Sequence, residues 1–214
     1  MDGTVLKTEE FWQEAVLELL KERNIIFFTE VQKNMLKAFS GISSIVAAQK
    51  LKDEFQLSES IKVLADELRE RAERRYLVAI EFVAGFEEFA YELKKNGIRL
   101  GLATNADIEG LGRLAKQMNL SRFFGDNMFS MVHAGNRPKP DPAVFLHTAL
   151  ALGIKPEECL VFEDSIFGIQ AARAANMKVI AIKTLFNEDD RGHAHHAIEH
   201  YGEALSAIKK ILEI

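Results

Sequence analysis

The segment that decides the fold is ECLVFEDSIFGIQAARAANMKVIAIK, residues 158–183. An apolar run at 158–164 ends in two acidic residues, a helical pattern covers 165–176, and a second apolar run covers 177–183. This strand–helix–strand order is typical of a parallel sheet. Right-handed crossovers place the carboxyl ends of such strands at one edge of the sheet, where ligands bind.

The same alternation begins near residue 84. Two further apolar runs, 98–104 and 127–133, predict strands, and the segments between the four runs can form amphipathic helices. We therefore predict an α/β fold whose core is a Rossmann-like parallel sheet with helices on both faces.

The segment before this core predicts helices alone. Phe11, Ala15 and Leu19 lie at helical spacing, and later helical patterns, such as TEVQKNMLKAF at 29–39, open with Thr or Ser, which are preferred N-caps. We expect an all-helical cap domain inserted into the α/β core. The expected boundaries are 9–79 for the cap domain, and 1–8 with 80–214 for the core.

Composition and charge argue against several classes of function. The 214 residues are 48% hydrophobic and carry a formal net charge of −5, which argues against binding to a nucleic-acid backbone. No apolar run reaches the roughly 18 residues of a membrane span, and no charged start precedes an apolar stretch as in a secretory signal. Cys159 is the only cysteine, so no intrachain disulfide can form, which fits the reducing cytoplasm.

Polar side chains gather where the predicted strands end. They are Asp2, Thr4, Thr104, Asn105, Lys139, Glu163 and Asp164. Carboxylates hold a hard cation, a cation and a lysine together neutralise phosphate oxygens, and hydroxyl, amide and N–H groups bind the remaining oxygens. Each residue alone is also typical of a helix N-cap or a solvated loop, but their joint position at one sheet edge favours a phosphate site.

Four segments resemble the signature motifs of the haloacid dehalogenase superfamily. They are DGT at 2–4, LATNA at 102–106, RPKPDPAVF at 137–145 and VFEDSIFGIQAARAANM at 161–177. The chain is most similar to the branch that contains β-phosphoglucomutase and the small sugar-phosphate phosphatases, with the helical segment in the place of that branch's cap domain. The resemblance implies a Mg²⁺-dependent enzyme that hydrolyses a small phosphate ester, such as a sugar phosphate, through an aspartyl-phosphate.

The first motif starts inside the family pattern, which is a hydrophobic strand followed by Asp-x-Asp-Gly-Thr. Met1 occupies x, and Asp2 is the second Asp. The resemblance therefore implies that the nucleophilic first Asp, and a central strand between those at 98–104 and 158–164, would stand before Met1. We expect a sheet without its central first strand, and no activity from the 214-residue chain.

The resemblance also assigns roles residue by residue. Asp2 would act as the general acid and then as the general base. Thr104 and Asn105 would bind phosphate oxygens, and Lys139 would neutralise both the nucleophile and the phosphoryl group. The implied ligands of Mg²⁺ are Asp2 (through its main-chain carbonyl), Glu163 and Asp164.

Phosphatase and mutase activities are both compatible with these motifs. Trp12 stands where the resemblance places a mutase histidine, and the cap loop offers Ser43 and Ser44 but no arginine for a second phosphate. We therefore expect substrate contacts from these three residues, and we favour a phosphatase over a β-phosphoglucomutase-type phosphohexomutase.

Two other interpretations stay open. A pseudoenzyme or binding protein would keep the fold and the metal site without the nucleophile. The segment RGHAHHAIEH at 191–200 makes a transition-metal site conceivable, although such polar loops are more often solvated. For the enzyme we expect a small-molecule phosphate ester as partner, neither nucleic acid nor membrane, and a monomer or weak dimer.

Overall fold

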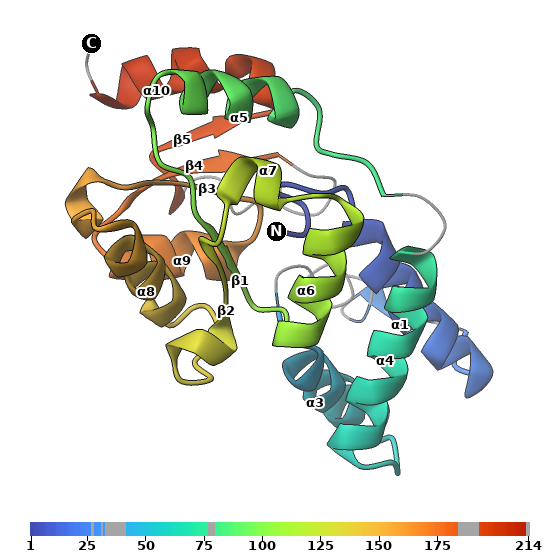
Figure 1. Ribbon diagram of the computed structural model, residues 1–214. Coiled ribbons are helices and arrows are strands. Elements are labelled where there is room, and N and C mark those ends of the chain that lie inside the picture. Colours follow the sequence, from blue (N-terminus) through green and yellow to red (C-terminus); the bar gives the residue numbers. More distant parts are fainter. Residues whose placement is uncertain (27, 31, 33–41, 77–79, 184–192, 213–214) are drawn as a thin grey trace.

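The structure, a computed structural model, describes most of the chain (Figure 1). The described residues are 1–26, 28–30, 32, 42–76, 80–183 and 193–212. Most of the helix predicted at 29–39 lies outside them. At its start, Thr29 Oγ1 accepts a hydrogen bond from Gln32 N at 3.2 Å and Gln32 Oε1 accepts one from Thr29 N at 2.9 Å, so the expected N-cap is present.

Helices make up the N-terminal part, and helices with short strands make up the rest. The helices are α1 (Glu9–Glu22), α3 (Ser44–Phe55), α4 (Ile61–Tyr76), α5 (Phe86–Lys95), α6 (Ile108–Gln117), α7 (Ser121–Phe124), α8 (Ala143–Leu152), α9 (Ile166–Ala174) and α10 (Ala204–Leu212). The strands are β1 (Leu102–Thr104), β2 (Met128–Ser130), β3 (Leu160–Glu163), β4 (Lys178–Ile182) and β5 (His196–Ile198). Short 3₁₀ segments are η1 (Met131–Ala134), η2 (Pro156–Glu158) and η4 (Tyr201–Glu203). Within the described ranges, no helix combines the length and the apolar character that crossing a membrane would require.

The described strands pair in parallel and form two sheets. β1 pairs with β2, while β3, β4 and β5 form the second sheet in that order, with Val161 opposite Val179 and Ile180 opposite His196. The prediction of an α/β fold with a parallel sheet is confirmed, although each strand is shorter than its apolar run. β1 and β3, the strands that we expected on either side of a missing central strand, belong to different sheets.

Helices cover both faces of the larger sheet (Figure 1). Ile180 and Ile182 of β4 pack into a cluster with α5 and α10, whereas Val179 and Ala181 pack with α8 and α9. Because successive side chains of a strand point to opposite faces, a strand buried on both faces is apolar at nearly every position. This burial explains the apolar run MKVIAIK, and it gives the core its helix–sheet–helix layers.

β5 departs from the sequence prediction, and α10 lies where the sequence analysis predicted no element. β5 forms within the segment that we interpreted as a polar, histidine-rich loop, and α10 packs on it. His195 Nδ1 accepts a hydrogen bond from Val179 N and His200 Nδ1 accepts one from Gly202 N, both at 3.1 Å. These ring nitrogens bind the backbone, and among the described residues no group of three or more metal-binding side chains is found.

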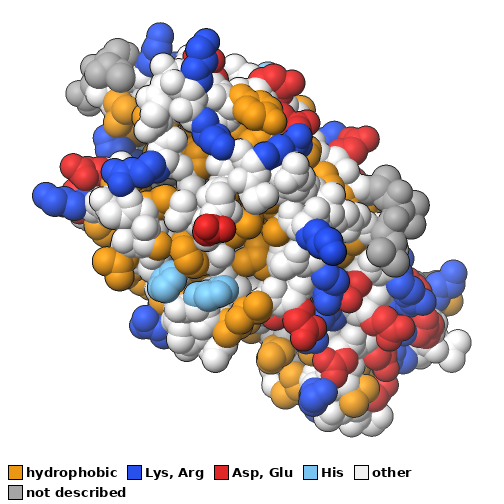
Figure 2. All heavy atoms as spheres, viewed as in Figure 1, with side chains coloured by type: hydrophobic (Ala, Val, Ile, Leu, Met, Phe, Trp, Pro, Cys, Tyr) orange, Lys and Arg blue, Asp and Glu red, His pale blue; other side chains and the backbone are white. Residues whose placement is uncertain are grey.

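Helices α1, α3 and α4 form a helical bundle, called the bundle below. Leu64 and Leu68, one turn apart on α4, are fully buried in the apolar cluster that the three helices share. Ion pairs join the outer faces of α1 and α4, such as Arg75 with Glu14 at 2.7 Å and with Glu18 at 2.8 Å. Figure 2 shows the resulting surface, where basic and acidic side chains are interspersed at the lower right.

The buried stripe of α4 should dominate the stability of the bundle. We expect Leu68→Ala to lower the free energy of unfolding by about 2–5 kcal/mol, because it removes a fully buried side chain and leaves a cavity. Val63→Ala, on the exposed face of the same helix, should change it by less than about 0.5 kcal/mol. Urea unfolding followed by circular dichroism measures both, and equal effects would contradict this packing.

Candidate active site

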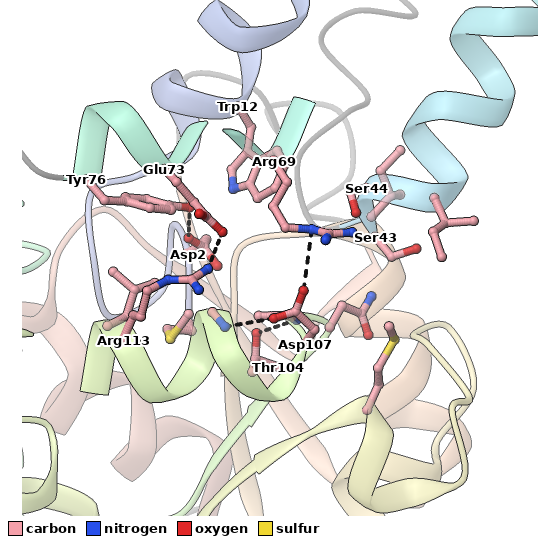
Figure 3. A pocket seen from close by; sticks show the side chains of 18 of the residues that line it. Asp2, Trp12, Ser43, Ser44, Arg69, Glu73, Tyr76, Thr104, Asp107 and Arg113 are labelled. Atoms are coloured by element: carbon pink, nitrogen blue, oxygen red, sulfur yellow. Dashed lines mark hydrogen bonds and ion pairs between the residues drawn. The ribbon is translucent and has the colours of Figure 1, made fainter. Parts of the chain in front are cut away.

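A cavity of about 470 Å³ lies between the bundle and the carboxyl ends of β1 and β3. This volume suits a small-molecule ligand. Figure 3 shows side chains from both parts of the molecule pointing toward it. Nine of the ten residues predicted at the site line this one cavity: Asp2, Trp12, Ser43, Ser44, Thr104, Asn105, Lys139, Glu163 and Asp164. The tenth, Thr4, is not among the lining residues.

The N-terminal loop places Asp2 at the edge of the sheet. Gly3 has φ 68°, a left-handed conformation that glycine adopts without strain, and its N–H donates to Leu6 O at 2.8 Å. Thr4 Oγ1 donates to Asp164 Oδ1 at 2.7 Å, and Tyr201 Oη donates to Thr4 O at 3.1 Å. One buried hydrogen bond therefore joins the first motif to the fourth, and a second joins the first motif to η4.

Two hydroxyls donate to the side chain of Asp2. Thr8 Oγ1 lies 2.6 Å from Asp2 Oδ1. Tyr76 Oη lies 3.1 Å from the same oxygen, and Figure 3 shows this second bond. Thr8 precedes α1 and Tyr76 ends α4, so the two donors come from the two places where the chain passes between the core and the bundle. Sequence reasoning missed both of them.

Lys139 is buried, with 7% of its surface exposed, and is not the solvated loop residue that its proline-rich surroundings suggest. Its ammonium group is paired with Glu163, donates to Ala103 O at 3.2 Å and lies 4.5 Å from the ring centre of Phe145. Its main-chain N–H donates to Asn105 Oδ1 at 2.9 Å. The lysine therefore contacts the ends of both β1 and β3.

The end of β3 carries two buried carboxylates with different electrostatics. Burial raises the pKa of Asp164 to about 6, and the charge of Glu163 acts in the same direction. Burial alone would also raise the pKa of Glu163, but the ammonium group of Lys139 and the α-amino group of Met1 hold that pKa below its usual value. Negative charge on Asp164 is thus the less well compensated.

The start of α9 fits closely against Glu163. Ser165 is the N-cap, and its Oγ accepts from Gly168 N at 3.0 Å and donates to Glu163 Oε2 at 3.1 Å. A Cβ atom at position 168 would lie 2.0 Å from the Glu163 carboxyl carbon. Only glycine at this position leaves room for the carboxylate under the helix.

The donor set at the end of β3 fits Mg²⁺. Proteins commonly bind this ion through one or two carboxylates, with water and substrate oxygens as further ligands. Glu163 and Asp164 supply two carboxylates, and within the described ranges no third acidic, histidine or cysteine side chain completes a group with them. The main-chain carbonyl of Asp2, water and substrate oxygens would have to complete the coordination.

The turn after β1 presents Thr104 and Asn105 to the cavity. Thr104 Oγ1 accepts from Ala106 N at 3.1 Å. The N-cap of α6 is Asp107, whose Oδ1 accepts from Gly110 N at 2.7 Å. The alternative interpretation of Thr104 and Asn105 as the cap of this helix is therefore wrong.

The bundle contributes the opposite wall of the cavity. Ser43 is the N-cap of α3, where its Oγ accepts from Val46 N at 3.4 Å, and Ser44 and Trp12 lie beside it on the cavity wall. The helix start and the indole ring therefore line the same cavity as the predicted phosphate residues.

Two ion pairs that sequence reasoning missed join α4 to α6 across the cavity. Arg69 Nε lies 3.4 Å from Asp107 Oδ2, and Arg113 is paired with Glu73 (Figure 3). In the sequence these residues read as ordinary charged helix faces, so no local signal marks them. In the structure they hold the bundle against the core.

Known proteins resemble this chain over most of its length. The family model described as haloacid dehalogenase-like hydrolase matches residues 1–182. Protein SUPPRESSOR OF QUENCHING 1, chloroplastic, of Arabidopsis thaliana is 31% identical over 88% of this chain, which spans 18% of that protein. Fructose-1-phosphate phosphatase of Escherichia coli is 29% identical over 86% of this chain and 94% of its own. A solved haloacid dehalogenase-like protein of Agrobacterium tumefaciens has a TM-score of 0.80 at 23% identity, covering 99% of this chain and 96% of its own, which shows the fold.

The raised pKa of Asp164 predicts how stability depends on pH. Its folded value of about 6 lies above the unfolded value of about 3.9, so the folded chain holds an extra proton between these pH values. Ionisation of Asp164 therefore lowers stability as pH rises through this window, while Glu163, with its lowered pKa, acts in the opposite sense. In metal-free protein we expect Asp164→Asn to raise the melting temperature at pH 7.5, by a gain that shrinks toward pH 4.

Calorimetry tests the same residue as a metal ligand. Mg²⁺ requires the ionised carboxylate, so its affinity should fall as pH drops below about 6, and Asp164→Asn should weaken binding strongly at every pH. Glu158→Gln, in the exposed turn before β3, is the control. Unchanged Mg²⁺ binding in Asp164→Asn, or a lower melting temperature at pH 7.5, would contradict the assignment.

Proposed function

The chain belongs to the haloacid dehalogenase-like hydrolases, and from that premise we propose that it is a Mg²⁺-dependent phosphatase of a small sugar phosphate. Phosphomonoester hydrolysis itself follows from the family and from relatives that are named as phosphatases. The observation that carries the proposal is the convergence on one cavity of Asp2, the buried Lys139, and the carboxylates of Glu163 and Asp164.

Each residue has one task in the proposed reaction. An aspartate carboxylate, which the family pattern places two residues before Asp2, forms a bond to phosphorus while the ester P–O bond breaks. Asp2 gives a proton to the departing alkoxide, and then takes a proton from the water that releases inorganic phosphate. Thr104 and Asn105 hold the non-bridging oxygens.

Charge compensation completes the site. Lys139 is held beside the phosphoryl position by its contacts with Ala103 O and Glu163, and its ammonium group offsets negative charge on phosphorus oxygens. When bound, Mg²⁺ supplies further positive charge to these oxygens, with Glu163, Asp164 and the main-chain carbonyl of Asp2 as its protein ligands.

A sugar phosphate is the substrate class that the cavity and the relatives support. The cavity is of small-molecule size and offers the hydroxyls of Ser43 and Ser44 beside the apolar face of Trp12. The Escherichia coli relative is named for fructose 1-phosphate. Trp12 in place of a mutase histidine supports hydrolysis over phosphoryl shuttling.

The proposal includes the organisation and setting of the protein. A cap domain at 9–79 and a core at 1–8 and 80–214 are supported by the apolar cluster of the bundle, which is distinct from the clusters of the sheet. Of the described cap residues, Phe11 and Tyr76 pack with the core, near the places where the chain crosses between the two parts. We further propose a monomer or weak dimer in the reducing cytoplasm, which the single Cys159 supports.

Activity should depend on a strand and a nucleophile ahead of Met1. We expect the 214-residue chain to release no phosphate above background from 4-nitrophenyl phosphate with Mg²⁺. A second form should carry about ten added residues, a hydrophobic strand whose last residue is an Asp directly before Met1. We expect this form to hydrolyse the ester. We also expect it to have a higher melting temperature, because the added strand would pair with both β1 and β3. Equal rates in the two forms would mean that the nucleophile lies elsewhere.

The active form should then be tested on hexose, pentose and deoxyhexose monophosphates for phosphate release. Conversion of β-glucose 1-phosphate to the 6-phosphate faster than phosphate appears would make the mutase assignment correct. Failure of both forms on every ester would favour the binding-protein interpretation.

Lys139→Ala should lower kcat/KM by about 100-fold or more in the active form, because it removes a buried positive charge from the transferring phosphoryl group. Lys95→Ala, on the exposed last turn of α5, is the control. The assay is run below the melting temperature of each variant, since the substitution also leaves Glu163 unpaired. A kcat/KM within about twofold of that of the unmodified enzyme would show that Lys139 has only a structural role.

A further inference from the structure

We propose that Tyr76, the last residue of α4, is a positioning residue for the carboxylate of Asp2, and that it makes proton transfer by Asp2 depend on how the bundle is seated on the core. The inference rests on the proposed function, because it concerns the same acid–base group.

The hydrogen bonds at Asp2 define which oxygen does the chemistry. Tyr76 Oη and Thr8 Oγ1 both donate to Oδ1, at 3.1 Å and 2.6 Å. Tyr76 is 8% exposed and Thr8 is fully buried, so water competes little for either bond. Two donors on one oxygen fix the rotation of the carboxylate, and we assign proton transfer to Oδ2.

The phenol of Tyr76 remains a donor at any pH used for a phosphatase assay. Burial raises the pKa of Tyr76 well above its usual value, and both the charge of Asp2 and the hydrogen bond to it act in the same direction, while a hydrogen bond with Trp12 opposes them. The hydroxyl therefore keeps its proton, and the bond to Asp2 persists over that range.

Tyr76 is anchored to both parts of the molecule. Its main-chain oxygen accepts from Gln117 Nε2 of α6 at 2.6 Å, and its ring lies edge-on to Phe11 of α1 with 5.7 Å between ring centres. The position of its hydroxyl is thus set by the packing of α4 on α1 and on the core.

This anchoring couples the bundle to the acid–base group. A displacement of α4 away from the core would break the bond from Tyr76, while Thr8 would remain because it belongs to the same N-terminal segment as Asp2. The carboxylate is held by both donors only when the bundle covers the cavity, which is also when bulk water is excluded from the phosphoryl group. Proton delivery to the leaving group is therefore faster in the covered site.

Tyr76→Phe removes the hydroxyl and keeps the ring against Phe11. In whichever of the two forms hydrolyses an ester, we expect kcat/KM for an alkyl ester such as glucose 6-phosphate to fall about tenfold or more, because its alkoxide needs a proton to leave. For 4-nitrophenyl phosphate, whose leaving group is stable without a proton, the fall should be less than about threefold. Tyr91→Phe, on the exposed face of α5, should change neither value.

Equal losses on the two esters, or no loss on either, would overturn the proposal, because a purely structural or binding role does not depend on the leaving group. If no form hydrolyses any ester, the proposed function fails. The hydrogen bond between Tyr76 and Asp2 is then tested by a double-mutant cycle, in which urea unfolding gives the free energy of unfolding of each variant. Non-additive effects of Asp2→Ala and Tyr76→Phe would support the bond, and additive effects would overturn it.

Discussion

The buried ion pair between Lys139 and Glu163 is the interaction on which the rest of the site depends. Lys139 follows β2, donates to Ala103 O of β1 and pairs with the last residue of β3, so one side chain joins two sheets that share no strand hydrogen bonds. Both charged groups are removed from water, and only close pairing and hydrogen bonding offset that cost. Removing one partner of such a pair typically costs about 3–5 kcal/mol.

The same pair sets the electrostatics of the cavity. Glu163 has its counter-charge in Lys139, whereas Asp164, at the next position, is compensated mainly by the α-amino group of Met1, then by the hydroxyl of Thr4 and by Lys139. Two neighbouring buried carboxylates beside one lysine carry negative charge that a bound cation would neutralise. A phosphate dianion with its metal ion is a ligand whose charges fit that arrangement.

The bundle covers the side of the cavity opposite Lys139, Glu163 and Asp164. Its own stability comes mainly from the apolar cluster of α1, α3 and α4. Tyr76 and Phe11 also pack into the apolar cluster of the core, but the contacts across the cavity are polar: Arg69 with Asp107, Glu73 with Arg113, and Tyr76 with Asp2. Polar contacts can be broken in water at less cost than a packed apolar interface, because water replaces the lost hydrogen bonds. The bundle and the core are each held together by apolar packing, while polar contacts join them across the cavity. This arrangement suits a cavity that must open to admit a ligand.

Local patterns were enough to predict the α/β class, four of the five described strands, the helical bundle and six polar residues that line the cavity, since side-chain periodicity, N-capping and motif spacing act over a few residues. Trp12, Ser43 and Ser44 were assigned from the family resemblance. Local patterns did not predict β5, whose three residues become a strand only because β4 offers them an edge. Nor did they predict the burial of Lys139, the bonds from Thr8 and Tyr76 to Asp2, or the ion pairs between α4 and α6. Tyr76 lies 74 positions from Asp2 in the chain, and Thr4 lies 160 from Asp164. Which partner each polar group finds at such separations is decided by the packing of whole elements, because only that packing fixes the distances and removes the competing water.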